Sequence, residues 1–351
     1  MRKRSQAAGP FARDIAVDLG TSSVVMVMRG RGILLHEPSV VAADRQTGKV
    51  LQAGSAARDT LGRTPGELIA IRPLREGVIS DYTTAQAMLE CFLKQAIPGR
   101  MTKPRLLICV PSGISEVEER AVVDAGLQAG ARRVYLMEEP LAAALGAGVD
   151  ISQPEGRMVV DIGGGTTDVA VIALDGVVTS ACLTAAGDQF DEALIRHIRQ
   201  EHGLLIGLRT AEEVKKAIGR VAGPEEDNPT LAVKGRCLET GLPRQITLSA
   251  QETAIAFAPV AEQLCAGVEA VLERTPPELA ADVSASGLLL TGGGSLLPGL
   301  DQLLETRTGI RTMVAEDPLA CVALGLELCL PYLARRQDGV LGLARRRQLR
   351  P

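Results

Sequence analysis

Residues 161–168 read Asp161-Ile162-Gly163-Gly164-Gly165-Thr166-Thr167-Asp168, a glycine turn between two runs of branched apolar residues. A shorter turn in the same setting, Asp18-Leu19-Gly20-Thr21, stands near the start of the chain. Glycine has no Cβ atom, so backbone N–H groups there can approach phosphate oxygens, and neighbouring hydroxyls add donors. One such turn would favour an ordinary hairpin. Two in matching settings predict two similar halves that bind one phosphate chain, which makes ATP the first ligand to consider.

Each turn follows an aspartate that ends the preceding strand. Asp18 and Asp161 are therefore expected to face each other across a cleft. Mg²⁺ prefers oxygen ligands and keeps several of its waters. The pair predicts a Mg²⁺ site in which the two carboxylates hold the ion through water.

Composition sets the class of protein. The 351 residues exceed one ordinary core and predict two domains, and 46% hydrophobic with 23% charged residues is typical of a globular protein. A net charge of −4 argues against bulk nucleic-acid binding. The seven cysteines form no C-x-x-C pair, which favours reduced thiols over a zinc site. Both ends are basic, Met1–Arg4 and residues 345–350, and are interpreted either as solubilising tails or as weak attractors of anionic lipid.

The apolar patterns predict an alternating α/β chain. Strands are expected at 15–17, 24–28, 33–35, 40–43, 106–110, 134–137, 158–161, 169–173, 177–183 and 288–290. Helices are expected at 55–61, 83–95, 115–130, 141–148, from Asp188 onward, 214–221, 249–274, 298–305 and 322–333. Three capping boxes are predicted at helix starts, at Ser115 with Glu118, Thr210 with Glu213, and Ser249 with Glu252.

Three further segments are candidates for nucleotide chemistry. Gly292-Gly293-Gly294-Ser295-Leu296 follows a buried strand and offers bare backbone to an adenine or ribose, although triple glycine also marks tight turns. Glu212 and Lys215 are one helical turn apart, which suits ribose and base contacts or, alternatively, a surface ion pair. Glu139, before Pro140, is either an acidic residue favoured at a helix start or the group that orients water toward the γ-phosphate.

Together these segments resemble the superfamily of actin, heat-shock chaperone and sugar kinase ATPases. More specific stretches resemble the bacterial actin homologues of the MreB family, which includes paralogues such as Mbl. These stretches are Gly30-Arg31-Gly32-Ile33, Glu37-Pro38-Ser39-Val40-Val41, Gly62-Arg63-Thr64-Pro65-Gly66, residues 71–79, Val110-Pro111-Ser112-Gly113, Thr275-Pro276-Pro277-Glu278-Leu279 and Ala315-Glu316-Asp317-Pro318. The resemblance runs from about residue 14 to residue 333.

The resemblance implies an actin-like α/β fold, in which two similar domains, each a mixed sheet flanked by helices, surround a nucleotide cleft. Domain I is expected at 14–146 plus 317–335, with a small subdomain at about 33–77. Domain II is expected at 147–316, with a small subdomain at about 185–247. Residues 1–13 and 336–351 are then basic tails.

The resemblance also assigns roles by position, with ATP and Mg²⁺ as cofactors. Nucleotide contacts fall on Gly20, Thr21, Ser22, Ser23, Gly163, Gly164, Gly165, Glu212, Glu213, Val214, Lys215, Gly293, Gly294, Ser295 and Leu296. Hydrolysis roles fall on Glu139, Thr166 and Asp168, and metal roles on Asp18 and Asp161.

The implied function is an ATP-binding cytoskeletal protein that polymerises into paired protofilaments in the cytoplasm, at the inner face of the cell membrane. Its partners would be itself, the anionic membrane surface and the cell-wall elongation machinery, and it would set rod shape. ATPase activity coupled to polymerisation is expected.

Three departures from the family pattern bear on activity. Ser22-Ser23 replaces the usual Ala-Asn, Asp168 replaces a Glu near the γ-phosphate, and the loop 98–102 offers only Met101 for membrane insertion. Asp168 therefore leaves open a scaffold paralogue with weak ATPase activity. Two further functions fit the same superfamily: a small-molecule kinase, with Asp188 or Asp191 as candidate bases, and a chaperone, which would need an added peptide-binding domain.

Overall fold

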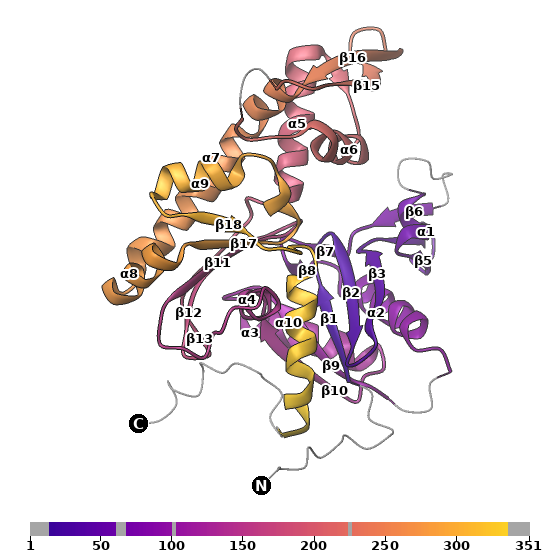
Figure 1. Cartoon of the computed structure of the whole chain (residues 1–351). Helices are drawn as coiled ribbons and strands as arrows, with labels where there is room; N and C mark the ends of the chain where they lie inside the picture. Colours follow the sequence, from indigo (N-terminus) through magenta and orange to yellow (C-terminus); the bar gives the residue numbers. More distant parts are fainter. Residues whose placement is uncertain (1–13, 61–67, 100–102, 224–226, 336–351) are drawn as a thin grey trace. The chain divides into compact units, whose positions relative to one another are not determined.

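The computed structural model describes residues 14–60, 68–99, 103–223 and 227–335. The predicted loop at 98–102 therefore falls partly outside the described residues, and the stretch Gly62–Gly66 falls wholly outside them. The chain divides into two compact units (Figure 1). Unit 1 runs to Gly148 and resumes at Val322, and unit 2 is Val149–Cys321.

Unit 1 is built on a five-stranded mixed sheet in the order β10-β9-β1-β2-β3. Its strands are β1 (Asp14–Leu19), β2 (Ser23–Met28), β3 (Gly32–Pro38), β9 (Arg105–Val110) and β10 (Arg133–Glu138). β1 is antiparallel to β2 and parallel to β9. The helices of this unit are α2 (Tyr82–Ala96), α3 (Glu116–Gln128), α4 (Glu139–Gly146) and α10 (Cys321–Cys329), which continues as the 3₁₀ turn η2 (Leu330–Arg335).

Unit 2 repeats this plan with a sheet in the order β13-β12-β11-β17-β18. Its strands are β11 (Arg157–Ile162), β12 (Thr167–Ala173), β13 (Gly176–Leu183), β17 (Leu288–Thr291) and β18 (Thr312–Val314). β11 is antiparallel to β12 and parallel to β17, as β1 is to β2 and β9. The two similar halves predicted from the glycine turns are thus present in the topology. The helices are α5 (Gly187–His202), α7 (Ala250–Arg274), α8 (Pro277–Ser286) and α9 (Leu300–Thr308), with the 3₁₀ turn η1 (Gly293–Leu296).

Each unit also carries a small three-stranded sheet. In unit 1 it comprises β5 (Val50–Ala53), β4 (Val41–Asp44) and β6 (Leu68–Ile71), next to α1 (Ser55–Arg58) and the hairpin β7 (Leu74–Arg75) and β8 (Val78–Ile79). In unit 2 it comprises β14 (Leu204–Leu205), β15 (Thr230–Cys237) and β16 (Pro243–Ser249), next to α6 (Leu208–Ile218). Several of these strands were not predicted. Some, such as β6 and β14, are too short to show a pattern, and others, such as β15 and β16, mix polar and apolar residues.

The core of each unit is mainly aliphatic, as expected from a chain with only four Phe and three Tyr. In unit 2, alternate residues of the central strands, such as Val160 and Val169, point to the core with α5 and α7. Phe190 and Phe257 meet there edge to face, with ring centroids 5.2 Å apart. Period-2 alternation leaves Asp161 and Asp168 on the opposite face of the same sheet.

Two of the three predicted capping boxes are present. Ser115 with Glu118 caps α3, and Ser249 with Glu252 caps α7. The third prediction was wrong, because α6 begins at Leu208 after Gly207, which leaves Thr210 inside the helix. The helix α8 was not predicted, although Pro277 stands at its first residue, where proline is favoured.

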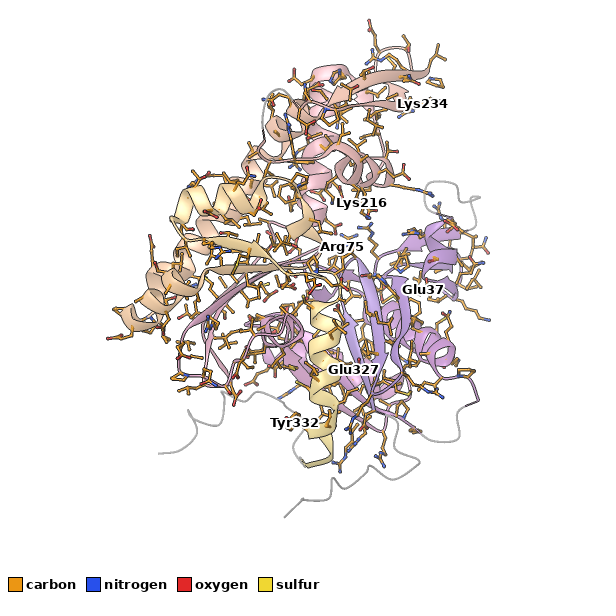
Figure 2. The ribbon with its side chains drawn as sticks, in the orientation of Figure 1. Glu37, Arg75, Lys216, Lys234, Glu327 and Tyr332 are labelled. Carbon is orange, nitrogen blue, oxygen red and sulfur yellow. The ribbon has the colours of Figure 1, made fainter. Side chains whose placement is uncertain are left out.

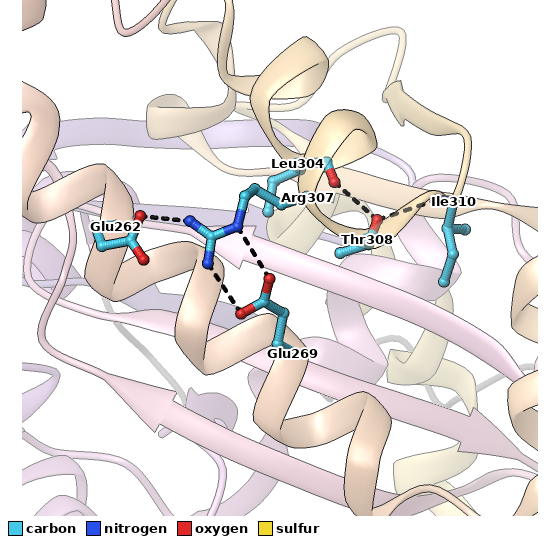
Figure 3. Close-up of polar contacts among 6 residues, drawn as sticks. All are labelled: Glu262, Glu269, Leu304, Arg307, Thr308 and Ile310. Atoms are coloured by element: carbon cyan, nitrogen blue, oxygen red, sulfur yellow. Dashed lines mark hydrogen bonds and ion pairs between the residues drawn. The ribbon is translucent and has the colours of Figure 1, made fainter.

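By length and composition alone, α7 could cross a membrane. Its packing explains its apolar character differently, because residues such as Phe257, Leu264 and Val268 are fully buried in unit 2. Its outer face carries Glu262 and Glu269, which both pair with Arg307 of α9 (Figure 3). The pair with Glu269 is bidentate, at 3.1 and 3.2 Å. The helix is therefore a core helix of unit 2.

Candidate nucleotide-binding site

The first glycine turn joins β1 to β2 and is held closed by backbone and side-chain bonds. Gly20 N donates to Ser23 O at 3.1 Å, and a Cβ atom on Gly20 would lie 2.9 Å from that oxygen. Ser39 Oγ donates to Gly20 O at 2.5 Å. Thr21 Oγ1 accepts from Gly77 N at 3.0 Å, so the buried Thr21 hydroxyl is aligned by the β7–β8 turn. The turn is therefore preorganised, with Ser22 exposed at its tip.

The end of β1 brings together Asp18, Cys109 and Glu139. One ligand atom of each lies within 4.8 Å of the others. The Cys109 thiol donates to Asp18 Oδ1 at 3.2 Å. Burial, with the charges of Asp18 and Glu139, raises the pKa of the Cys109 thiol well above its usual value, so the thiol stays protonated. Two carboxylates at the start of α4 and the end of β1 are the oxygen donors that Mg²⁺ prefers, so the donor chemistry of unit 1 fits that ion.

Cys109 was not among the predicted site residues. It reaches Asp18 because β9 runs parallel to β1, with Val17 paired to Ile108. A sequence pattern does not reveal which residues of two distant strands become neighbours, so only the strand register could have identified it.

The second turn joins β11 to β12, and Gly163 N donates to Thr166 O at 2.8 Å. Asp161 and Asp168 are directly opposite each other in this hairpin, so their side chains share one face of the sheet. Thr291 of β17 extends the row and donates to Asp161 Oδ1 at 2.6 Å. Cys182 of β13 extends it on the other side, with its thiol 3.5 Å from Asp168 Oδ2. Asp161 and Asp168 are only 3% and 1% exposed, so unit 2 offers a buried polar row, whereas Asp18 is half-buried.

The start of α5 is bonded to the second turn. Gly187 N donates to Gly163 O at 3.1 Å, and Asp188 N donates to Gly164 O at 2.7 Å. These carbonyls point toward α5. In a trans peptide the next N–H points the opposite way, so the N–H groups of Gly164 and Gly165 point away from α5. Adjacent N–H groups of this kind form a concave site for phosphate oxygens.

The third glycine segment has a packing reason of its own. A Cβ atom on Gly292 would lie 2.4 Å from Ile162 O, and one on Gly294 would lie 2.2 Å from Ile162 Cγ2. Both glycines therefore allow η1 to pack on the end of β11, beside the second turn. Ser295 Oγ donates to Gly292 O at 2.7 Å, and Leu296 is 54% exposed. A nucleoside contact at this segment stays a prediction.

The candidates on α6 contact several different partners, and their nucleotide contacts stay a prediction. Glu212 pairs with Lys216 at 2.5 Å. Lys215 Nζ instead lies 2.9 Å from Asp191 Oδ1 and donates to Gly187 O at 2.7 Å. The rest of that segment divides between core and surface, since Val214 is 1% exposed and Glu213 pairs with Arg209 at the surface. The Val214 side chain belongs to the core, which leaves only its backbone for a ligand.

Comparison with known proteins adds what geometry alone does not give. The family model described as MreB/Mbl protein matches residues 12–337. The chain belongs to the MreB/Mbl family. It is 48% identical to the cell shape-determining protein Mbl of Bacillus subtilis over 91% of this chain and 96% of that protein. It is 47% identical to the cell shape-determining protein MreB of Escherichia coli K12 over 90% of this chain and 93% of that protein. Membership in this family sets aside the kinase and chaperone hypotheses.

Solved structures of similar proteins share the fold. MreB5 of Spiroplasma citri is 34% identical, with a TM-score of 0.86 in its AMPPNP-bound structure, covering 92% of this chain and 97% of that one. Its ADP-bound structure gives a TM-score of 0.88, covering 92% and 98%. MamK, solved as a double helical filament, is 25% identical with a TM-score of 0.77, covering 93% of this chain and 100% of that one. The predicted actin-like fold is thereby confirmed.

Proposed function

We propose that this MreB/Mbl-family protein binds ATP with the glycine turns of both units and polymerises into filaments that determine cell shape. The observation that carries the proposal is the family match over residues 12–337, together with a preorganised turn at the equivalent position of each repeated sheet. The AMPPNP and ADP bound to Spiroplasma citri MreB5 support a purine nucleotide as the ligand. In this proposal unit 1 is domain I and unit 2 is domain II.

The phosphates would be bound mainly by backbone N–H groups. In unit 2 these are the N–H groups of Gly164 and Gly165, which point away from α5. The hydroxyl of Thr166, next in the sequence, would add a donor. In unit 1 the turn from Gly20 to Ser23 would supply further N–H and hydroxyl donors. The nucleoside would meet Glu212 and the backbone of 293–296. Mg²⁺, when bound, would be held through water by Asp18 and Asp161 and would neutralise phosphate charge.

We assign the hydrolytic role to Glu139. Its carboxylate lies at the start of α4, within 4.8 Å of the Asp18 and Cys109 ligand atoms. There it would orient a water molecule toward the terminal phosphate, while Thr166 positions that phosphate. Asp168 is buried opposite Asp161, and its shorter side chain would slow hydrolysis relative to a family member with Glu. The proposal therefore includes weak ATPase activity.

Polymerisation would use head-to-tail contacts between identical chains, since a heterologous contact that does not close generates a filament. The double helical filament of MamK supports this architecture, and paired protofilaments are the arrangement we propose here. The cell-wall elongation machinery would then follow the filament.

A membrane contact is proposed at the ends of unit 1. Arg105 binds Asp14 with two bonds of 2.6 Å and donates to Leu333 O at 3.3 Å, so the described chain begins and ends at one place. The basic segments Met1–Arg4 and 345–350 extend from these two ends. Tyr332 is 57% exposed near the end of the described chain (Figure 2). Leu328, four residues earlier, is 58% exposed. Basic sequence segments and exposed apolar side chains are the two features that would attract the chain to the anionic inner face of the cell membrane.

Sedimentation of purified protein tests the proposal. The protein would be spun with Mg-ATP on anionic vesicles, with neutral vesicles, no vesicles and no nucleotide as controls, while phosphate release is followed. We expect nucleotide-dependent pellets that contain ordered filaments in electron micrographs, and stronger pelleting on anionic than on neutral vesicles. A monomer that stays in the supernatant under every condition would contradict the filament proposal.

A further inference from the structure

The Lys215 side chain is mostly buried, and its ammonium group contacts α5. It is 15% exposed, and its ammonium group contacts both Asp191, which is 7% exposed, and the carbonyl of Gly187. Both partners belong to the first turns of α5, whereas Lys215 belongs to α6. The Lys215 ammonium group therefore holds α5 by one ion pair, to Asp191, and one hydrogen bond, to Gly187 O.

The contacts continue from α5 into the glycine turn. Gly187 O, which accepts from Lys215, lies in the first turn of α5. In the same helical turn, Gly187 N donates to Gly163 O and Asp188 N donates to Gly164 O. Thr167 Oγ1 adds a bond of 2.7 Å to Ala185 O, just before the helix. A Cβ atom on Gly187 would lie only 3.3 Å from Gly163 O and Gly164 Cα, so the helix start and the turn are in close contact. Moving the start of α5 therefore moves the turn.

We propose that Lys215 is a positioning residue, which clamps the first turn of α5 against the glycine turn and so aims the N–H groups of Gly164 and Gly165 at nucleotide phosphates. This assignment differs from the direct nucleoside contact expected from sequence. Burial raises the pKa of Asp191 to about 6 despite the opposing charge of Lys215, so the clamp is a buried pair in which each partner depends on the other. The effect on nucleotide rests on the proposed ATP binding, but the effect on the turn does not.

A matched control lies next to Lys215 in the chain. Lys216 is on the same helix, carries the same charge and pairs with Glu212, but its side chain is 69% exposed (Figure 2). Lys215→Met and Lys216→Met therefore remove the same group from a buried clamp and from a surface pair. Because Lys215→Met leaves a buried carboxylate without its cation, the double variant Lys215→Met, Asp191→Asn provides a version with no uncompensated charge.

The first arm of the test needs no nucleotide. Hydrogen–deuterium exchange is measured on full-length wild type and variants, in peptides that cover 163–168 and 186–190. We expect exchange there to be faster by about tenfold in Lys215→Met and in the double variant, and unchanged in Lys216→Met. Exchange equal to wild type in both Lys215 variants would overturn the clamp.

The second arm compares affinities for ATP, ADP and adenosine. If Lys215 clamps the phosphate turn, Lys215→Met should lower the affinities for ATP and ADP by about tenfold. The affinity for adenosine should stay within about twofold of wild type. An equal loss of affinity for adenosine would mean that Lys215 contacts the nucleoside directly, and it would overturn the positioning role. If wild type itself binds none of the three, the proposed function fails, while the exchange arm still decides the clamp.

Discussion

Two side-chain hydroxyls hold the turn of unit 1, since Ser39 donates to Gly20 and Thr21 accepts from Gly77. In unit 2, two backbone N–H groups at the start of α5 hold the turn, and the Thr167 hydroxyl adds one bond. The acidic residues beside the two turns differ in burial. Asp18 is half-buried among Cys109 and Glu139, while Asp161 and Asp168 lie buried in a polar row across four strands. Similar topology thus supports two different sites. The first is suited to chemistry that needs water, and the second to rigid placement of phosphate.

The largest effect is expected at the wetter site. Glu139→Ala should slow phosphate release by about 100-fold or more, because the group that orients the attacking water is lost, while ATP affinity changes little. Phosphate release and nucleotide binding would be measured on the same preparation. Glu138→Ala is the matched control, since this neighbouring acid ends β10 and should release phosphate at close to the wild-type rate. An unchanged rate in Glu139→Ala would remove its assigned role.

Replacing the two aspartates should separate stability from binding. Asp161→Ala leaves the buried Thr291 hydroxyl without its acceptor and should cost about 2–4 kcal/mol of unfolding free energy. Asp18→Ala should cost less than about 1 kcal/mol, because its carboxylate is partly solvated and its partner is a thiol. Urea unfolding of nucleotide-free protein measures both. Equal costs would contradict the contrast between a buried and a half-buried carboxylate.

The Asp191 carboxyl gives a pH test of the unit 2 turn. Its folded pKa of about 6 exceeds the ordinary aspartate value of 3.8, so the folded state binds this proton more tightly, and the stability it contributes falls as pH rises through this range. Lys215→Met should raise that pKa by about one unit more, because the attraction of the ammonium is lost. Unfolding free energy measured between about pH 5 and 7 should then fall more steeply with pH in Lys215→Met than in wild type. Asp191→Asn should lack the part of the pH dependence that comes from this carboxyl. If the unfolding free energy changes equally with pH in all three proteins, the buried pair is contradicted.

The smallest effects concern the hydroxyls that close each turn. Ser39→Ala and Thr167→Val each remove one donor to a backbone carbonyl, Gly20 O in unit 1 and Ala185 O in unit 2. Each should cost about 1 kcal/mol, which is the usual net value of one such bond. Thermal unfolding measures the two costs side by side. A loss confined to one variant would show that only one turn depends on its hydroxyl.

The sequence predicted what is local and what is repeated. Both glycine turns, the strands around them and the helix starts at Ser115 and Ser249 follow from spacing within a few residues, and the structure has them. Thr210 has the same spacing with Glu213 but lies inside α6, because Gly207 already begins that helix. Local spacing identifies a possible cap, and packing decides whether the helix begins there.

The contacts that tune the site were not predictable. Cys109 beside Asp18 depends on the parallel register of two strands, which brings together residues 91 positions apart in the chain. The clamp at Lys215 depends on how α6 packs on α5, and its i,i+3 spacing to Glu212 instead suggested a surface pair. The glycines at 292 and 294 were interpreted as a ligand platform or a tight turn, and their close packing against Ile162 could not be read from either interpretation. Tertiary contacts of this kind carry no signature in neighbouring residues.

Hydrogen–deuterium exchange with and without Mg-ATP tests the central claim most directly, because it reports on each turn separately. If both glycine turns bind nucleotide phosphates, ATP should slow exchange in peptides covering 18–23 and in peptides covering 161–168, while surface segments such as the β15–β16 hairpin stay unchanged. Protection of only one turn, or of neither, would contradict the account.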